Sequence, residues 1–177
     1  MSLKEITKDK HTEAEHTPFM KAVFDKTMPE DVWASYTHGK MLWYNAIECV
    51  AKAKGLLDDL QGIERSHLLY LDYKDLMKDK PFHEYKPEML DYYKYILKLD
   101  GDKVLAHLYT WHMGDMYGGQ MIKKIIPGPH RNLEFKDVET LKTNLRAKLH
   151  DGLGDEAVRA FEWAIKIMHT YDDRLNV

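Results

Sequence analysis

Two features of this sequence have residue types and spacing that could support chemistry: its histidines and the glycine-rich segment GDMYGGQ at residues 114–120. Of the ten histidines, His11 has the most suggestive neighbours. On a helix, Lys4, Lys8 and Glu15 would share its face, because residues three, four and seven positions apart lie on one side. Glu15 could then hold the second ring nitrogen of a metal-ligating histidine, and the lysines could meet carboxylates of a ligand. A solvated, charged helix face would show the same spacing.

The glycine-rich segment lies between two stretches that favour a helix, and no proline separates them. Gly114, Gly118 and Gly119 would each cost that helix about 1 kcal/mol relative to alanine. Gly114 and Gly118 are four residues apart, so the absence of their side chains would open one face to a flat, bulky ligand. Asp115 would stand at the edge of that opening. Close packing of two helices through small residues would explain the same pattern.

A second metal-binding pattern competes with His11. Glu13–His16 and Glu64–His67 are both Glu-x-x-His pairs. Two such pairs, with one carboxylate from each of two further helices, form a di-iron or di-manganese site in helical bundles. Glu48 is the best candidate for such a partner. Clear partners in apolar surroundings are otherwise scarce, which favours coincidence in a chain so rich in histidine and glutamate.

Several other classes of site are excluded or disfavoured. The chain lacks the Gly-x-x-x-x-Gly-Lys phosphate loop and the Gly-x-Ser-x-Gly nucleophile motif, and no predicted strand precedes the glycine-rich segment, which excludes a dinucleotide fold. The net charge of −3, without a basic patch, argues against a nucleic-acid partner. The single cysteine, Cys49, fits a reducing compartment, and its context AIECVA predicts a buried, unreactive thiol.

The elements that must position these residues are predicted to be helices. Proline and capping residues mark their starts, and apolar residues follow helical spacing. The predicted helices cover residues 3–15, 18–26, 30–54, 63–77, 87–98, 100–126, 136–151 and 155–173. Alternating polar and apolar runs of strand length are absent, so the sequence predicts an all-α bundle, with residues 1–177 as one domain.

The distribution of apolar residues also predicts where the protein resides. No apolar run approaches the roughly 20 residues that cross a bilayer. The first 16 residues lack an apolar stretch, and the C-terminal HTYDDRLNV is polar. We therefore expect a soluble, cytoplasmic protein without a signal peptide or a membrane anchor.

Three segments resemble those of heme oxygenases. KDKHTEAEHTPFM (8–20) resembles the segment around the proximal histidine of that family. HLYTWHMGDMYGGQMIKKI (107–125) resembles its distal-helix signature, and LKTNLRAKL (141–149) resembles a later segment that supplies basic residues. Their order and rough spacing also agree. The resemblance implies an all-α domain that holds heme between a proximal helix and a kinked distal helix.

The resemblance assigns roles to individual residues. It implies that His11 is the axial ligand of the heme iron and that the backbone at Gly114 and Gly118 crosses the heme face. Asp115 resembles the aspartate that holds a water network on the distal side. The other residues that it implies for heme binding, several of them for the propionates, are Lys4, Lys8, Glu15, Tyr109, Lys142, Arg146 and Phe161.

The activity implied by the resemblance is cleavage of heme by O₂ and electrons to biliverdin, CO and ferrous iron. Heme would be both substrate and cofactor. The α isomer of biliverdin is the common outcome in the family, and compact soluble members take electrons from ferredoxin. A bilin reductase is a candidate downstream partner. Lys123, Lys124 and Arg131 could form a basic surface for the electron donor, or an ordinary solvated face.

The sequence departs from the family pattern beside the glycines. Trp111 and His112 stand where many members have arginine and tyrosine, and Tyr117 stands where a small residue, often serine, is usual. The Trp111 change leaves open a protein that binds heme without turning it over. His16 stands where the family often has asparagine, and we expect it to face away from the ligand because it follows His11 by five residues.

Overall fold

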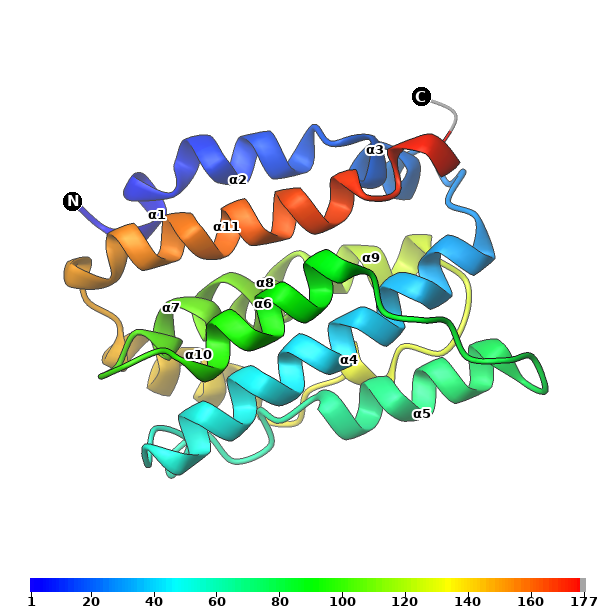
Figure 1. The fold of residues 1–177 in the computed structure, drawn as a ribbon. Helices are drawn as coiled ribbons and strands as arrows, with labels where there is room; N and C mark the ends of the chain where they lie inside the picture. Colours follow the sequence, from blue (N-terminus) through cyan, green and yellow to red (C-terminus); the bar gives the residue numbers. More distant parts are fainter. Residues whose placement is uncertain (176–177) are drawn as a thin grey trace.

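The computed structural model describes residues 1–175, so the last two residues of the predicted domain lie outside the described part. Every regular element in residues 1–175 is helical, which confirms the predicted fold class. The α-helices, labelled in Figure 1 where there is room, are α1 Leu3–Ile6, α2 Lys8–Glu15, α3 Pro18–Phe24, α4 Glu30–Ala53, α5 Ser66–Met77, α6 Pro87–Leu97, α7 Val104–Leu108, α8 Gly114–Tyr117, α9 Gly119–Ile125, α10 Val138–Lys148 and α11 Gly154–His169. A π-helical segment, Tyr109–Met113, joins α7 to α8, and short 3₁₀ turns occupy Arg131–Leu133, Asp151–Leu153 and Asp172–Arg174.

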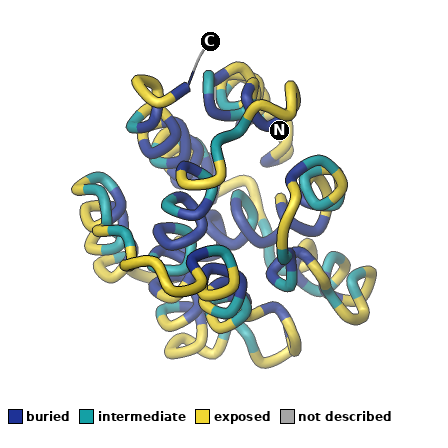
Figure 2. The backbone as a smooth tube through the Cα atoms, turned by 90° about the vertical axis from the view of Figure 1, so that its right-hand side faces the viewer, coloured by how far each residue is buried: buried dark blue, intermediate teal, exposed yellow. Residues whose placement is uncertain are grey.

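The long helix α4 is the centre of the bundle. It packs against α5, α6 and α7, while α11 packs against α2, α3 and α7. Figure 1 shows α2 running beside α11 and α4 crossing the molecule next to α5. Trp43, Tyr44 and Ile47 of α4 are fully buried, and Figure 2 shows that buried residues lie on the inward faces of the helices. No helix in residues 1–175 combines the length and apolar character needed to span a bilayer.

Three predicted helix starts, at residues 3, 18 and 87, are confirmed together with the local signal that marks each of them. The Ser2 hydroxyl accepts a hydrogen bond from the Glu5 backbone N–H, and the Glu5 carboxylate accepts one from the Ser2 backbone N–H. The Thr17 hydroxyl caps α3, and Pro87 begins α6 at its first position, where a missing N–H costs nothing. These local signals explain why these three starts are readable from the sequence.

Several predicted helices differ from the structure at their ends: α5 begins at Ser66 and not at residue 63, α10 covers Val138–Lys148 and not 136–151, and α11 ends at His169 and not at residue 173. Two further differences involve specific side chains. The first helix, predicted over residues 3–15, is divided at Thr7, whose angles of φ −93° and ψ 0° depart from those of a regular helix. The Thr7 hydroxyl and backbone N–H both donate to the Leu3 carbonyl oxygen, at 2.7 and 2.9 Å. The helix predicted over residues 100–126 begins later, because α7 starts at Val104 after a turn, and the Asp100 carboxylate pairs with Lys103 in that turn.

One prediction about burial is wrong. Cys49 is exposed, and its Sγ lies 3.9 Å from the side-chain oxygen of Asn45. The neighbours of Cys49 are apolar, but a helix turns about 100° per residue, so adjacent residues face different ways. Cys49 therefore shares the solvent side of α4 with Asn45, four residues earlier.

The glycine-rich segment forms part of one kinked helical path from α7 to α9. The predicted extent, to about residue 126, agrees with the end of α9 at Ile125. The π-helical turn directly before Gly114 was not predicted. It adds one residue to the hydrogen-bonded loop and so changes the direction in which the following residues point. Gly118 separates α8 from α9 while keeping right-handed helical angles, φ −65° and ψ −28°.

Candidate functional site

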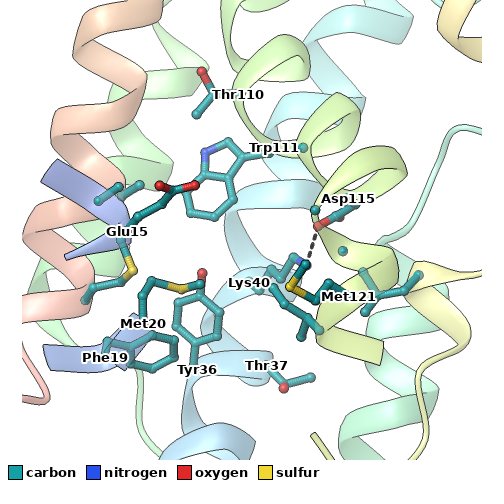
Figure 3. Close-up of a pocket in the computed structure, with 18 of the residues that line it drawn as sticks. Glu15, Phe19, Met20, Tyr36, Thr37, Lys40, Thr110, Trp111, Asp115 and Met121 are labelled. Carbon is teal, nitrogen blue, oxygen red and sulfur yellow. Dashed lines mark hydrogen bonds and ion pairs between the residues drawn. The ribbon is translucent and has the colours of Figure 1, made fainter. Parts of the chain in front are cut away.

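A cavity of about 330 Å³ opens between two walls of the bundle. One wall comes from α2, α3 and α11, the other from α8 and α9, and α4 lies between them. Figure 3 shows Glu15, Phe19 and Met20 on one side and Asp115 and Met121 on the other. Most of the lining is apolar, and the volume lies at the lower end of the roughly 300–1,000 Å³ typical of ligand pockets.

His11 stands on the α2 wall with one ring nitrogen close to a carboxylate. Its Nδ1 lies 3.4 Å from Glu15 Oε1, one helical turn later. The imidazole and the ring of Phe161 on α11 pack in a T-shaped arrangement, with 5.7 Å between the ring centres. Because Nδ1 faces Glu15, Nε2 is the nitrogen available to a metal ion. His11, Glu15 and Phe161 all line the cavity, and their part in ligand binding stays a prediction.

The opposite wall exposes bare backbone. A Cβ atom added to Gly114 would meet no atom within 4 Å, and one added to Gly118 would meet only the Gly114 carbonyl oxygen, at 3.7 Å. Gly119 differs, because its added Cβ would lie 2.9 Å from Cδ2 of the buried Leu133. Both explanations of the glycines therefore hold, at different residues: Gly114 and Gly118 leave space in the cavity, and Gly119 permits close packing.

Asp115 is buried beside these glycines and is held from the long helix α4. Its Oδ1 accepts a hydrogen bond from Lys40 Nζ at 3.0 Å, and its Oδ2 accepts one from the Tyr44 hydroxyl at 2.6 Å. Burial raises the pKa of the Tyr44 phenol, and the Asp115 carboxylate raises it further. Sequence reasoning missed Lys40 and Tyr44. Their spacing of four residues within the mainly apolar part of α4 was the available signal.

Trp111 lines the cavity with its ring but directs its N–H away from Asp115. The indole N–H donates a hydrogen bond to the Tyr92 hydroxyl oxygen at 2.9 Å. The Tyr92 hydroxyl in turn donates its own proton to His107 Nδ1 at 2.6 Å. His107 Nε2 then donates to Glu156 Oε1 at 2.9 Å. This buried chain joins the π-helical segment to α6, α7 and α11, so it fixes where the Trp111 ring stands.

The ionisable members of this chain have shifted pKa values. Burial lowers the pKa of His107, against the opposing effect of Glu156. Burial raises the pKa of Glu156, but hydrogen bonds from His107 and Tyr95 outweigh it and bring the pKa to about 2. We therefore describe the pair as a neutral imidazole that donates to a carboxylate.

His112 fixes the π-helical segment from its other side. Its Nε2 lies 2.7 Å from Glu48 Oε2, and its ring stacks on Tyr44 with 4.3 Å between centres. The Glu48 carboxylate also accepts the backbone N–H groups of Arg65 and Ser66 at the start of α5. The side chain of Glu48 thus joins α4 to the π-helical segment and to the start of α5.

The alternative two-metal site gains no support from the geometry. Among residues 1–175, no group of three or more His, Cys, Asp and Glu side chains is arranged to hold a metal ion. The partner foreseen for such a site, Glu48, is bound to His112. Glu13 and Glu64 each pair with an exposed or half-buried lysine, Lys10 and Lys52.

The cavity brings together about half of the residues that the sequence singled out. The predicted site residues that line it are His11, Glu15, Gly114, Asp115, Gly118 and Phe161. Lys4 and Lys8 are exposed and lie outside its lining. Tyr109 is also outside it, with its hydroxyl 3.5 Å from Thr7 Oγ1. A role for these three residues in ligand binding stays a prediction.

Tyr117 links the glycine-rich segment to the predicted basic residues of α10. Lys142 Nζ lies 4.1 Å from the centre of the Tyr117 ring, and Arg146 donates a hydrogen bond to the Tyr117 hydroxyl. None of the three lines the cavity. The bulk of Tyr117 therefore does not fill the pocket: it gathers two cations beside one end of α8. Their predicted contact with ligand carboxylates stays a prediction.

Comparison with known sequences matches most of the chain to one family. The family model described as heme oxygenase matches residues 1–142. Heme oxygenase 2 of Mus musculus is 24% identical over 202 residues, which cover 96% of this chain and 64% of the mouse protein. Heme oxygenase of Guillardia theta is 29% identical over 137 residues, 71% of this chain and 57% of that protein. The chain thus spans less than two thirds of the length of these relatives.

Comparison with solved structures gives the same fold. Heme oxygenase-1 of the cyanobacterium Synechocystis, solved in complex with heme, aligns with a TM-score of 0.81 at 20% identity, over 97% of this chain and 91% of that one. Heme oxygenase of Leptospira interrogans aligns with a TM-score of 0.80 at 19% identity, over 96% of this chain and all of that one (100%). At these identities the likeness establishes the fold.

Proposed function

We propose that this chain, which belongs to the heme oxygenase family, binds heme between α2 and the α8–α9 segment and opens its ring oxidatively. The observation that carries the proposal is the pairing of the two walls. His11, oriented by Glu15, faces the cavity from one side. Bare backbone at Gly114 and Gly118, with Asp115 beside it, faces the cavity from the other.

The residues around the cavity fit a porphyrin. Its lining is mainly apolar and aromatic, which suits the faces of the ring, and Gly114 leaves open space where a side chain would otherwise stand. His11 would ligate the iron through Nε2, as proximal histidines do. Bound heme would supply both an iron that activates O₂ and the ring carbon that is oxidised.

The side chains of this protein would then control water and protons on the glycine side. Each carboxylate oxygen of Asp115 accepts one hydrogen bond from α4 and can accept a second, because a carboxylate oxygen has two acceptor sites. A water held at Asp115 would lie beside the open space at Gly114. The apolar remainder of the lining limits how many other waters enter. Asp115 is therefore the residue that we propose for placing a proton donor.

The products and partners follow from the family resemblance. We propose that the reaction yields biliverdin, as the α isomer, with CO and ferrous iron, and that residues 1–177 act as one domain. The proposed electron donor is ferredoxin, and a bilin reductase would use the product. Lys123 pairs with Glu134, and Arg131 pairs with Asp72 and Asp75, so the foreseen basic docking surface is partly neutralised.

Two measurements test the proposal. Hemin titrated into the purified protein should give a Soret band, and ferredoxin with its reductase, NADPH and O₂ should convert that band into bilin absorbance, with the isomer identified by chromatography. Absence of a Soret band in the folded protein would refute heme binding. Heme that binds but stays intact under O₂ and reductant would instead favour a heme carrier, the alternative left open by Trp111.

A further inference from the structure

Lys40 is a charged residue in an otherwise mainly apolar cavity. It projects from α4 toward Asp115, and Figure 3 shows it on the same side of the cavity as Asp115 and Met121. Among the described residues, it is the only lysine or arginine that lines the cavity. A long, flexible cation would ordinarily extend into water, so its inward position needs an explanation.

The contacts of Lys40 hold it in place. Its Nζ lies 3.0 Å from Asp115 Oδ1 and 3.4 Å from Asn132 Oδ1. The side chains of Lys40 and Asp115 are only 11% and 12% exposed, so water screens their ion pair weakly. The Tyr44 hydroxyl binds the other oxygen of the same carboxylate, so one face of α4 fixes both oxygens of Asp115.

An ammonium group has three N–H donors, and the structure accounts for two. The remaining donor belongs to a group on the cavity wall. Trp111, at the position where many family members have arginine, directs its only N–H to Tyr92. The cation next to Asp115 thus comes from α4 and not from the glycine-containing helical path.

We propose that Lys40 has two roles on the glycine side of the cavity: it positions Asp115, and its ammonium favours negatively charged small ligands bound there. The inference rests on the proposed function, because the ligand would bind to heme iron. A donor placed where negative charge gathers stabilises that charge most strongly inside a dry cavity. A purely structural ion pair would hold Asp115 but would not discriminate between charged and neutral ligands.

The test compares ligand affinities of heme-loaded variants. Lys40→Met removes the charge and keeps the length, Lys40→Arg restores the charge, and Lys52→Met on the exposed side of α4 is the matched control. Fluoride affinity of the ferric complex reports on anionic ligands, and CO affinity of the ferrous complex reports on a neutral one. We expect Lys40→Met to weaken fluoride binding about tenfold, the effect of losing one hydrogen bond to a charged group. CO affinity should change much less, and Lys40→Arg should recover most of the fluoride affinity.

A second measurement uses the protein without heme. Urea unfolding of Lys40→Met, Asp115→Asn and the double variant measures how strongly the two side chains depend on each other. We expect the double variant to lose clearly less unfolding free energy than the two single variants lose in total. Lys40→Gln replaces Lys40→Met in both arms if the methionine variant does not fold.

The outcomes separate the two proposals. Wild-type protein that folds but gives no Soret band refutes the proposed function and, with it, the ligand role of Lys40. Normal Soret bands with equal fluoride affinity in wild type and Lys40→Met overturn the ligand role alone. An equal loss of fluoride affinity in Lys52→Met also overturns the ligand role, because removal of a distant surface charge would then have the same effect. Additive unfolding free energies overturn the positioning of Asp115.

Discussion

Replacing Gly114 with alanine should separate stability from function. The added Cβ meets no atom within 4 Å, and Gly114 has ordinary right-handed helical angles, φ −57° and ψ −41°. Alanine at an unstrained helical position is favoured over glycine by about 1 kcal/mol. In a domain of this size, that gain corresponds to a rise of about 2–4 °C in Tm. Gly114→Ala should therefore stabilise the heme-free protein.

The same methyl group should weaken heme binding. Gly114 lines the cavity, so the new Cβ takes space that the proposal assigns to the porphyrin and its small ligand. Overfilling a packed site costs about 1–3 kcal/mol, which corresponds to roughly tenfold or more in Kd. Hemin titration followed at the Soret band measures this loss. Product chromatography under turnover conditions shows whether bilin yield falls with it.

Gly119→Ala is the matched control on the same segment. Its Cβ would lie 2.9 Å from Cδ2 of the buried Leu133, so a neighbour must move, and this cost offsets the gain in helix propensity. We expect Gly119→Ala to gain no stability. The reasoning is refuted if both variants raise Tm equally, or if Gly114→Ala leaves hemin affinity and bilin yield unchanged.

Four further outcomes are expected. His11→Ala should lose the axial-histidine spectrum of the hemin complex, and an unchanged spectrum would exclude His11 as ligand. Asp115→Asn should bind hemin normally but form less bilin per electron consumed, as chromatography would show; equal yield contradicts its role. Tyr117→Phe should change the ratio of biliverdin isomers if the cations that it gathers on α10 bind propionates, and an unchanged ratio counts against that contact. The heme-free protein should lose stability as pH falls. The folded-state pKa values of His107 and Glu156 both lie below their ordinary values of 6.5 and 4.5, so the unfolded chain binds more protons. The loss of stability should begin near pH 6.5 through His107 and continue between about pH 4.5 and 2 through Glu156. In urea titrations, Glu156→Gln should reduce the dependence of the unfolding free energy on pH in the lower range. An unchanged dependence in that variant would contradict the role given to Glu156.

The helices were largely predictable because their signals are local. A capping hydroxyl at Thr17 or a proline at position 87 acts within one turn of the chain, so the sequence alone identifies it. The π-helical turn before Gly114 has no such signal. It depends on His112 and Trp111 finding partners on α4 and α6, contacts that lie 64 and 19 residues away in the sequence.

On the glycine side of the cavity, the predicted residues are those that one motif contains. Gly114, Asp115 and Gly118 lie within seven residues, so the resemblance identified them together. Lys40 and Tyr44 lie 75 and 71 residues from Asp115, and no spacing rule links two helices whose contact is not yet known.

Glu48 is an example of a residue whose partners the sequence alone did not predict. The sequence suggested Glu48 as the best candidate for a carboxylate partner in a two-metal site. In the structure Glu48 is buried, at 2% exposure, and its partners are His112 and two backbone N–H groups. A buried carboxylate needs hydrogen bonds or an opposite charge. The sequence can indicate this need, but it does not identify the residues that satisfy it. Asp115 is a second example, because its partner cation, Lys40 on α4, is identified only by the contact between the two helices.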